Sequence, residues 1–104
     1  LATVCVCHIA TSERKLLQEH VQQEEILISA VGKKGFQIPG EWIKKGATVI
    51  DVATKKLGKK ITGDINFETA KERASYITPV PGGVGPVTNV MLIKNLLELY
   101  KRQI

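Results

Sequence analysis

Two continuous apolar stretches decide the fold: residues 26–31 read ILISAV, and residues 47–52 read ATVIDV. The first stretch is followed directly by a glycine, Gly32. Short uninterrupted apolar runs are typical of strands that are buried on both faces, as in parallel sheets. We therefore predict that both stretches form buried strands of a parallel sheet.

The N-terminal third of the chain alternates between strand and helix patterns. Residues 2–7 (ATVCVC) predict a short strand of apolar and β-branched residues. A helix is expected to begin at a cap on Thr11 or Ser12 and to end near Gln23. The two apolar stretches follow this helix, so strands and helices alternate from the start of the chain.

The second half of the chain combines turns, short elements and one long helix. We expect a loop with a short helical turn at residues 35–46, a loop or small hairpin at 55–63, a short helix capped by Asn66 at 67–74, and a strand at 76–80. Helical spacing of apolar residues predicts a last helix over residues 87–102, opened by Pro86 at its first position. The alternation indicates an α/β fold with a mainly parallel sheet, in which ligands bind beyond the carboxyl ends of the strands.

Composition and charge narrow the functional classes. The 104 residues are enough for one domain, and 43% hydrophobic with 24% charged residues exclude a disordered or collagen-like chain. No apolar run approaches the length of a membrane span, and no signal peptide is expected. The net charge of +5 suits an anionic partner, but the basic residues are scattered and only five residues are aromatic. We therefore expect a solvated basic surface rather than a nucleic-acid site, with residues 55–60 as a basic loop tip.

The cysteines and histidines do not predict a metal site. Cys5 and Cys7 would lie on one face of a strand, where they are badly placed for a disulfide. A site built from these two residues and His8 needs further ligands, and the other histidine, His20, belongs to the predicted helix. We expect reduced core cysteines and no bound metal.

The segment that carries most information about function is the loop at residues 79–86 (PVPGGVGP). Its prolines fix the backbone and its glycines permit close approach to a ligand, so its free N–H groups suit an anion or a carbonyl. A tight connection between a strand and a helix, with no ligand, explains the same composition equally well. Asp51 ends a predicted strand, whereas Asp64 follows Gly63 and is interpreted as a turn residue.

The sequence resembles the methylenetetrahydrofolate dehydrogenase/cyclohydrolase family. The resemblance rests on the string TPVPGGVGPVT (residues 78–88) and on three further strings in the same order as in the family: EEILISAVGKKGF, GEWIKKGATVIDV and GDINFETAKERAS. The likeness covers essentially the whole chain and is to the C-terminal, nicotinamide-cofactor domain. The resemblance implies a Rossmann-like three-layer sandwich over residues 1–104. It also implies an enzyme that oxidises 5,10-methylene-tetrahydrofolate with NADP, or alternatively NAD, and then hydrolyses the methenyl product to 10-formyl-tetrahydrofolate.

The resemblance also assigns residues to two binding regions. Tetrahydrofolate would be bound by Pro81, Gly82, Gly83 and Val84. The dinucleotide would be bound by His8, Ile9, Val31, Gly32, Ala53 and Thr88. Two of these positions depart from the family pattern: Ile9 replaces a polar or basic residue near the 2′-phosphate of NADP, and Ala53 replaces a glycine.

No catalytic residue is expected within this sequence. Three parts of the family's enzymes are not among these residues: the phosphate-binding loop, the catalytic lysine, and the strand that would lie between residues 2–7 and 26–31. We therefore expect the chain to be part of a longer enzyme. We expect that enzyme to be a homodimer and to be cytoplasmic or mitochondrial. The alternative is a non-catalytic module of the same ancestry that binds a dinucleotide or a protein partner. A basic nucleic-acid-binding module is a third alternative, supported by the charge alone.

Overall fold

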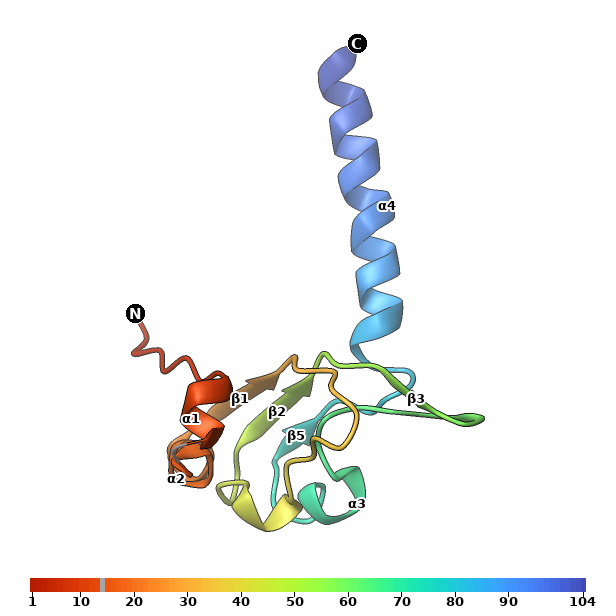
Figure 1. Cartoon of the computed structure of the whole chain (residues 1–104). Helices are drawn as coiled ribbons and strands as arrows, with labels where there is room; N and C mark the ends of the chain where they lie inside the picture. Colours follow the sequence, from red (N-terminus) through yellow and green to blue (C-terminus); the bar gives the residue numbers. More distant parts are fainter. Residues whose placement is uncertain (14) are drawn as a thin grey trace.

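The computed structural model describes residues 1–13 and 15–104 and is built on a three-stranded parallel sheet (Figure 1). The strand order is β1-β2-β5, with β1 at Ile26–Ser29, β2 at Thr48–Asp51 and β5 at Tyr76–Ile77. In this register Leu27, Val49 and Ile77 lie side by side across the three strands. The predicted α/β fold with a parallel sheet is confirmed, although β5 is shorter than the predicted strand at 76–80.

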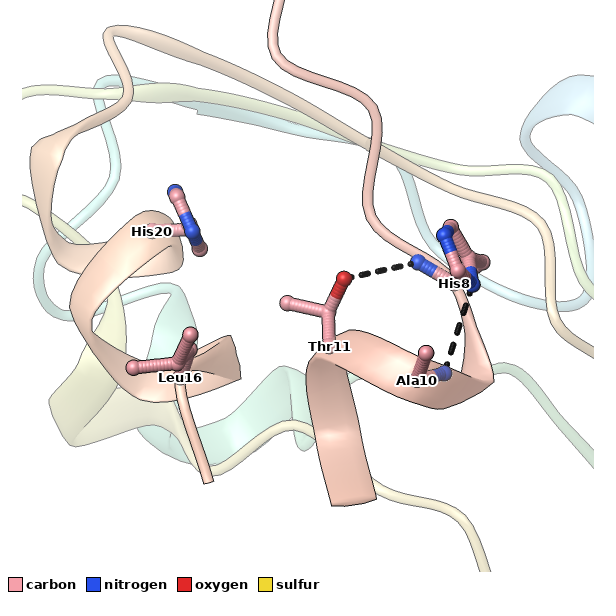
Figure 2. Close-up of a pocket in the computed structure, with 5 residues that line it drawn as sticks. All are labelled: His8, Ala10, Thr11, Leu16 and His20. Carbon is pink, nitrogen blue, oxygen red and sulfur yellow. Dashed lines mark hydrogen bonds between the residues drawn. The ribbon is translucent and has the colours of Figure 1, made fainter. Parts of the chain in front are cut away.

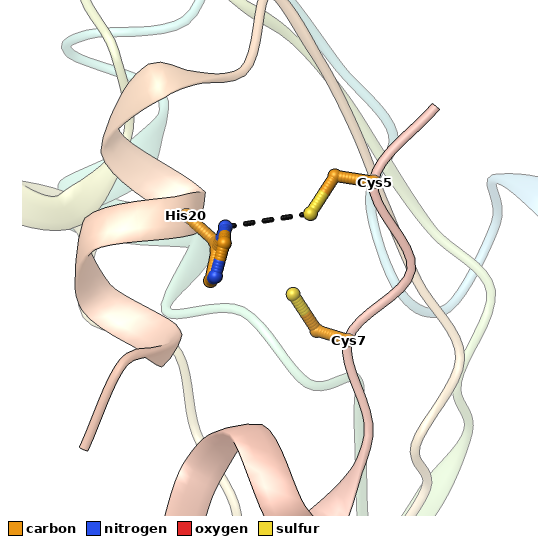
Figure 3. Close-up of side chains that lie close together, drawn as sticks. All are labelled: Cys5, Cys7 and His20. Atoms are coloured by element: carbon orange, nitrogen blue, oxygen red, sulfur yellow. Dashed lines mark hydrogen bonds between the residues drawn. The ribbon is translucent and has the colours of Figure 1, made fainter. Parts of the chain in front are cut away.

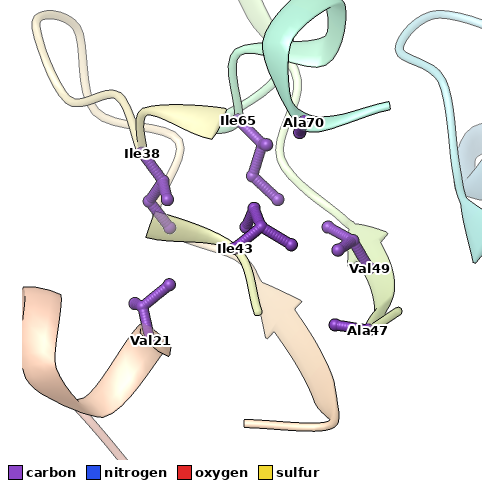
Figure 4. Close-up of a cluster of buried hydrophobic side chains, with 7 residues drawn as sticks. All are labelled: Val21, Ile38, Ile43, Ala47, Val49, Ile65 and Ala70. Atoms are coloured by element: carbon purple, nitrogen blue, oxygen red, sulfur yellow. The ribbon is translucent and has the colours of Figure 1, made fainter. Parts of the chain in front are cut away.

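The hydrophobic core lies on one face of this sheet (Figure 4). Val49 of β2 is fully buried there, and helix α2 (Leu17–Gln23), the 3₁₀ turn η1 (Gly40–Trp42) and helix α3 (Phe67–Ala70) contribute to the same cluster or lie beside it. The buried members are Val21, Ile38, Ile43, Ala47, Val49, Ile65 and Ala70. Because side chains alternate across a strand, this packing uses only every second residue of β1 and β2.

The opposite face of the sheet is open. Ile26, Ile28 and Tyr76 point to that side and are 62%, 63% and 73% exposed. The prediction that the strands are buried on both faces is therefore wrong, because within the described residues the helices and turns cover one face only.

The N-terminal residues differ from the prediction in two ways. Residues 2–7 do not form a strand, because a strand needs a hydrogen-bonded neighbour and none of the described residues pairs with this segment. The single predicted helix is instead α1 (Ile9–Glu13) followed by α2, with Lys15 in the left-handed region at φ 59° between them. The predicted helix also includes Arg14, which lies outside the described residues.

The start of α1 is capped by a residue that the sequence did not indicate. The Ala10 N–H donates to His8 Nδ1 at 3.3 Å, and the His8 N–H donates to Thr11 Oγ1 at 3.3 Å. The predicted caps Thr11 and Ser12 lie inside the helix. The cap prediction is wrong because the first helix, α1, begins at Ile9, whereas the apolar spacing that suggested a helix belongs to α2.

The turn before β2 and the elements between β2 and β5 agree with the sequence, except for the end of α3. Strands β3 (Lys55–Leu57) and β4 (Lys60–Thr62) form an antiparallel hairpin, and η1 is the expected helical turn. Asn66 caps α3, since its side-chain oxygen accepts a hydrogen bond from the Thr69 N–H at 3.4 Å. Helix α3 ends at Ala70, four residues before the predicted end at residue 74.

The last helix, α4 (Val84–Gln103), projects away from the sheet (Figure 1). It is longer than predicted and begins at Val84, so Pro86 occupies its third rather than its first position. None of its residues is buried, and its predicted apolar stripe is exposed; Val87, for example, is 60% exposed. None of the helices in the described part of the chain has the length and apolarity that a membrane span requires.

Candidate functional site

The parallel strands bring three loops to one edge of the sheet. The loops that follow β1, β2 and β5 contain Val31 and Gly32, then Ala53, and finally the glycine-rich residues 79–86. The Asp51 N–H at the end of β2 donates to Thr78 Oγ1 at 2.9 Å and thereby joins the ends of β2 and β5. Most of the residues assigned to ligand binding from the sequence therefore meet at this carboxyl edge, where α/β sheets bind their ligands.

Asp64 fixes the loop that follows β1. Its side chain is fully buried and accepts hydrogen bonds from Ser29 Oγ at 2.7 Å, from the Val31 N–H at 2.7 Å and from the Gly32 N–H at 3.0 Å. Gly32 has a φ of 67°, a conformation that side chains disfavour. The carboxylate thus holds two of the predicted cofactor residues in one backbone conformation.

A buried lysine compensates the charge of Asp64. Lys55 Nζ lies 3.5 Å from Asp64 Oδ1, and the two side chains are 5% and 0% exposed. The same ammonium donates to the Phe36 carbonyl and lies 5.7 Å from the centre of the Phe36 ring. The prediction that Lys55 belongs to an exposed basic loop tip is therefore wrong, because its partner lies nine residues further along the chain.

Asp51 organises the neighbouring turn. Its carboxylate accepts hydrogen bonds from the N–H groups of Ala53 at 3.2 Å, Asp64 at 3.1 Å and Ile65 at 3.0 Å. A Cβ at Gly63 would overlap this carboxylate, so the close approach of the two chain segments requires glycine. Asp51 and Asp64 are thus buried residues that position the surrounding backbone. In the sequence, the glycine before Asp64 indicates this close packing of two chain segments rather than a simple turn.

Val31 and Gly32 form an exposed part of this edge. Val31 is 54% exposed, and a Cβ at Gly32 would have no heavy atom within 4 Å. Ala53 differs from these residues in its burial: it is 6% exposed and lies behind this surface, and its contact with a cofactor stays a prediction. The edge therefore offers the Val31–Gly32 backbone to a ligand.

The glycine-rich loop divides into an open and a packed part. Pro81 and Gly82 are exposed, and Gly82 has a φ of 101° with open space beside it. Gly83 and Val84 are half-buried, and a Cβ at Gly83 would overlap the Pro79 carbonyl. The two interpretations of the loop therefore apply to adjacent glycines: Gly82 lies on an accessible surface, and Gly83 is part of a tight connection.

His8, Ile9 and Thr88 occupy other positions. His8 and the 66% exposed Ile9 lie at the start of α1, next to a hollow of about 330 Å³ (Figure 2). That hollow is lined by His8, Ala10, Thr11, Leu16 and His20 rather than by residues of the carboxyl edge. Thr88 is exposed in the first turns of α4, where its hydroxyl donates to the Val84 carbonyl at 3.0 Å.

The cysteines before α1 are not core residues. Cys5 is exposed and Cys7 is half-buried, so the prediction of core cysteines is wrong; both are free thiols. Burial raises the pKa of the Cys7 thiol above its ordinary value, and the adjacent Cys5 raises it further.

The chain as a whole matches a known family. The model of the tetrahydrofolate dehydrogenase/cyclohydrolase NAD(P)-binding domain matches residues 1–104. The chain belongs to this family. Its parallel α/β sheet is therefore the Rossmann-like sheet of that domain, as the sequence resemblance implied.

Solved structures agree with this assignment. A Trypanosoma brucei methylenetetrahydrofolate dehydrogenase-cyclohydrolase, complexed with NADP cofactor and inhibitor, is 49% identical over 84% of this chain, which covers 31% of that protein, with a TM-score of 0.76. The bifunctional enzyme of Campylobacter jejuni is 41% identical over 99% of this chain and 36% of its own length, with a TM-score of 0.86. A dehydrogenase from the silkworm Bombyx mori is 38% identical over 98% of this chain and 34% of its own, also with a TM-score of 0.86. The chain thus spans about a third of the length of these relatives.

Proposed function

We propose that this chain is the dinucleotide-binding part of a bifunctional enzyme that oxidises 5,10-methylene-tetrahydrofolate and hydrolyses the methenyl product. The observation that carries the proposal is the position of the glycine-rich loop. It lies at the same carboxyl edge as the exposed Val31–Gly32 backbone, in a chain that matches the family from end to end. One edge therefore presents a surface for the dinucleotide and a surface for the folate.

The dinucleotide would be bound where Val31 and Gly32 leave β1. The open space at Gly32 fits a ring or ribose that approaches the backbone, and the negative charge of Asp64 is buried and paired with Lys55. When bound, NADP supplies a nicotinamide that accepts a hydride. The NADP complex of the Trypanosoma brucei relative supports this cofactor, although Ile9 has no donor for a 2′-phosphate, so we propose reduced discrimination against NAD.

The folate would be bound against Pro81 and Gly82, with Gly83 and Val84 behind them. In the oxidation, a C–H bond of the methylene carbon breaks and its electron pair leaves with the hydrogen as hydride. In the hydrolysis, water adds to the resulting cationic carbon, one C–N bond opens and one proton passes to the solvent. The role of this loop in both steps is to orient the folate, since the described loop offers backbone and apolar groups rather than an acid or a base.

A chimera tests the proposal. The C-terminal third of the Campylobacter jejuni enzyme, which this chain matches over 99% of its residues, is replaced by residues 1–104, and both reactions are measured with NADP and NAD. We expect dehydrogenase and cyclohydrolase turnover from the chimera and none from the 104-residue chain alone. A folded chimera that binds neither NADP nor folate would contradict the proposal.

The same chimera distinguishes the alternative of a non-catalytic module. That alternative predicts dinucleotide binding without turnover, because Ile9 and Ala53 depart from the family pattern. The match to enzymes over 98% and 99% of the chain favours the catalytic function.

We further propose that the complete enzyme is a homodimer located in the cytoplasm or in mitochondria. The exposed apolar residues of α4 offer a surface for a second copy or for the rest of the same polypeptide, since a row of exposed leucines on one helix is unusual for a free surface. Light scattering of the complete enzyme tests the first statement, and fluorescence microscopy of a tagged protein tests the second.

A further inference from the structure

Three side chains that bind soft metal ions lie together before and on α2 (Figure 3). Cys5 and Cys7 extend from the segment before α1 toward His20 of α2. The sulfur atoms and a ring nitrogen of His20 all lie within 4.8 Å of one another, and Cys5 Sγ is 3.4 Å from His20 Nδ1. The sequence predicted no metal site here, because the approach of Cys5 to a helix residue fifteen positions away depends on the fold.

The spacing of these atoms is close to that of a tetrahedral zinc site. With Zn–S bonds of about 2.3 Å and Zn–N bonds of about 2.0–2.1 Å, tetrahedral ligands are separated by about 3.8 Å for S···S and about 3.6 Å for S···N. The distance between Cys5 Sγ and His20 Nδ1 already fits, and the remaining distances need to shorten by at most about 1.2 Å. Rotation of the exposed Cys5 side chain and of the half-buried Cys7 side chain is sufficient for this change.

We propose that Cys5, Cys7 and His20 form a zinc-binding site whose fourth position is open to solvent. Two thiolates and one imidazole form a donor set that zinc prefers over the hard cations magnesium and calcium. The exposure of Cys5 leaves room for a water molecule as the fourth ligand. This proposal does not rest on the proposed binding of folate or of a dinucleotide.

The site gives the segment before α1 a defined attachment. Residues 2–7 have no strand partner within the described part of the chain, so ladder hydrogen bonds do not hold them there. A metal ion bound by Cys5, Cys7 and His20 closes the chain between residues 5 and 20 and joins this segment to α2. Because the ion binds the folded chain, zinc is expected to raise the melting temperature of the chain.

The experiment is a titration of the reduced 104-residue chain with Co²⁺ in the absence of oxygen. Thiolate ligands give Co²⁺ an intense charge-transfer absorption, and we expect it to saturate at one equivalent and to disappear when Zn²⁺ is added. Cys5→Ser, Cys7→Ser and His20→Gln should each weaken Co²⁺ binding at least about tenfold. His8→Asn is the matched control, because asparagine preserves the cap of α1 and His8 is not a proposed ligand.

Three results would overturn the site. One is the absence of a charge-transfer band in the reduced chain, and another is an undiminished band after Cys5 and Cys7 are both replaced. The third is equal affinity of the wild-type and His20→Gln chains for Co²⁺, which leaves only a thiol pair. Circular dichroism of each variant without metal ensures that a loss of binding is not a loss of folding, and these partly exposed positions should tolerate the changes.

Discussion

Replacement of Asp64 by asparagine should strongly destabilise the fold. An asparagine can place its oxygen in only one of the two carboxylate oxygen positions, so its NH₂ group faces the N–H of either Val31 or Gly32. Lys55 is then left as a buried, unpaired cation, since its side chain is only 5% exposed. Removal of one partner of a buried ion pair costs about 3–5 kcal/mol, which lowers the melting temperature of a domain of this size by roughly 12 °C or more.

Thermal unfolding followed by circular dichroism measures this loss. The matched control is Glu68→Gln, which removes an exposed ion pair with Lys71 and should leave the melting temperature unchanged. Lys55→Met added to Asp64→Asn removes the unpaired charge and should recover part of the stability. If Asp64→Asn melts within a degree or so of Glu68→Gln, or if Lys55→Met adds a full further loss, the buried pair does not organise this edge of the sheet.

Three further changes probe the same edge. Gly63→Ala should cost about 1–3 kcal/mol in chemical unfolding, because its methyl group meets the Asp51 carboxylate; Gly85→Ala, which has open space in α4, is the control and should not destabilise. In the chimera, Gly83→Ala should abolish the binding of both folate and dinucleotide, because the added methyl group overlaps Pro79. Gly82→Ala should mainly weaken folate binding. If the two variants change both affinities equally, the division of the loop into an open and a packed part is wrong. Ile9→Arg should raise the preference of the chimera for NADP over NAD, and an unchanged ratio of kcat/KM values would place Ile9 away from the 2′-phosphate.

The local features of this fold could be predicted from the sequence. The apolar runs that became β1 and β2, the hairpin at Lys55–Thr62 and the Asn66 cap each depend on residues close together in the chain. The family likewise follows from a long motif that needs no structure. These features share the property that the interactions that decide them are local.

The predictions that were wrong concern features that depend on partners far away in the sequence. Residues 2–7 have a strand composition but no neighbouring strand within the described part of the chain, and the open face of β1 and β2 lacks a covering helix there. Asp64 resembles a turn residue until its contacts with Ser29 and Lys55 are known. The approach of His20 to Cys5 has the same origin, since two short helices replaced the one that was expected.

Helix α4 forms a long arm that follows directly on residues 79–83, the loop that we propose for folate binding. Its 20 residues form a rod about 30 Å long, and none of them is buried. A tilt of about 10° at its base therefore moves its free end by about 5 Å. A partner that packs along α4 would act on Pro81 and Gly82 through the base of this rod.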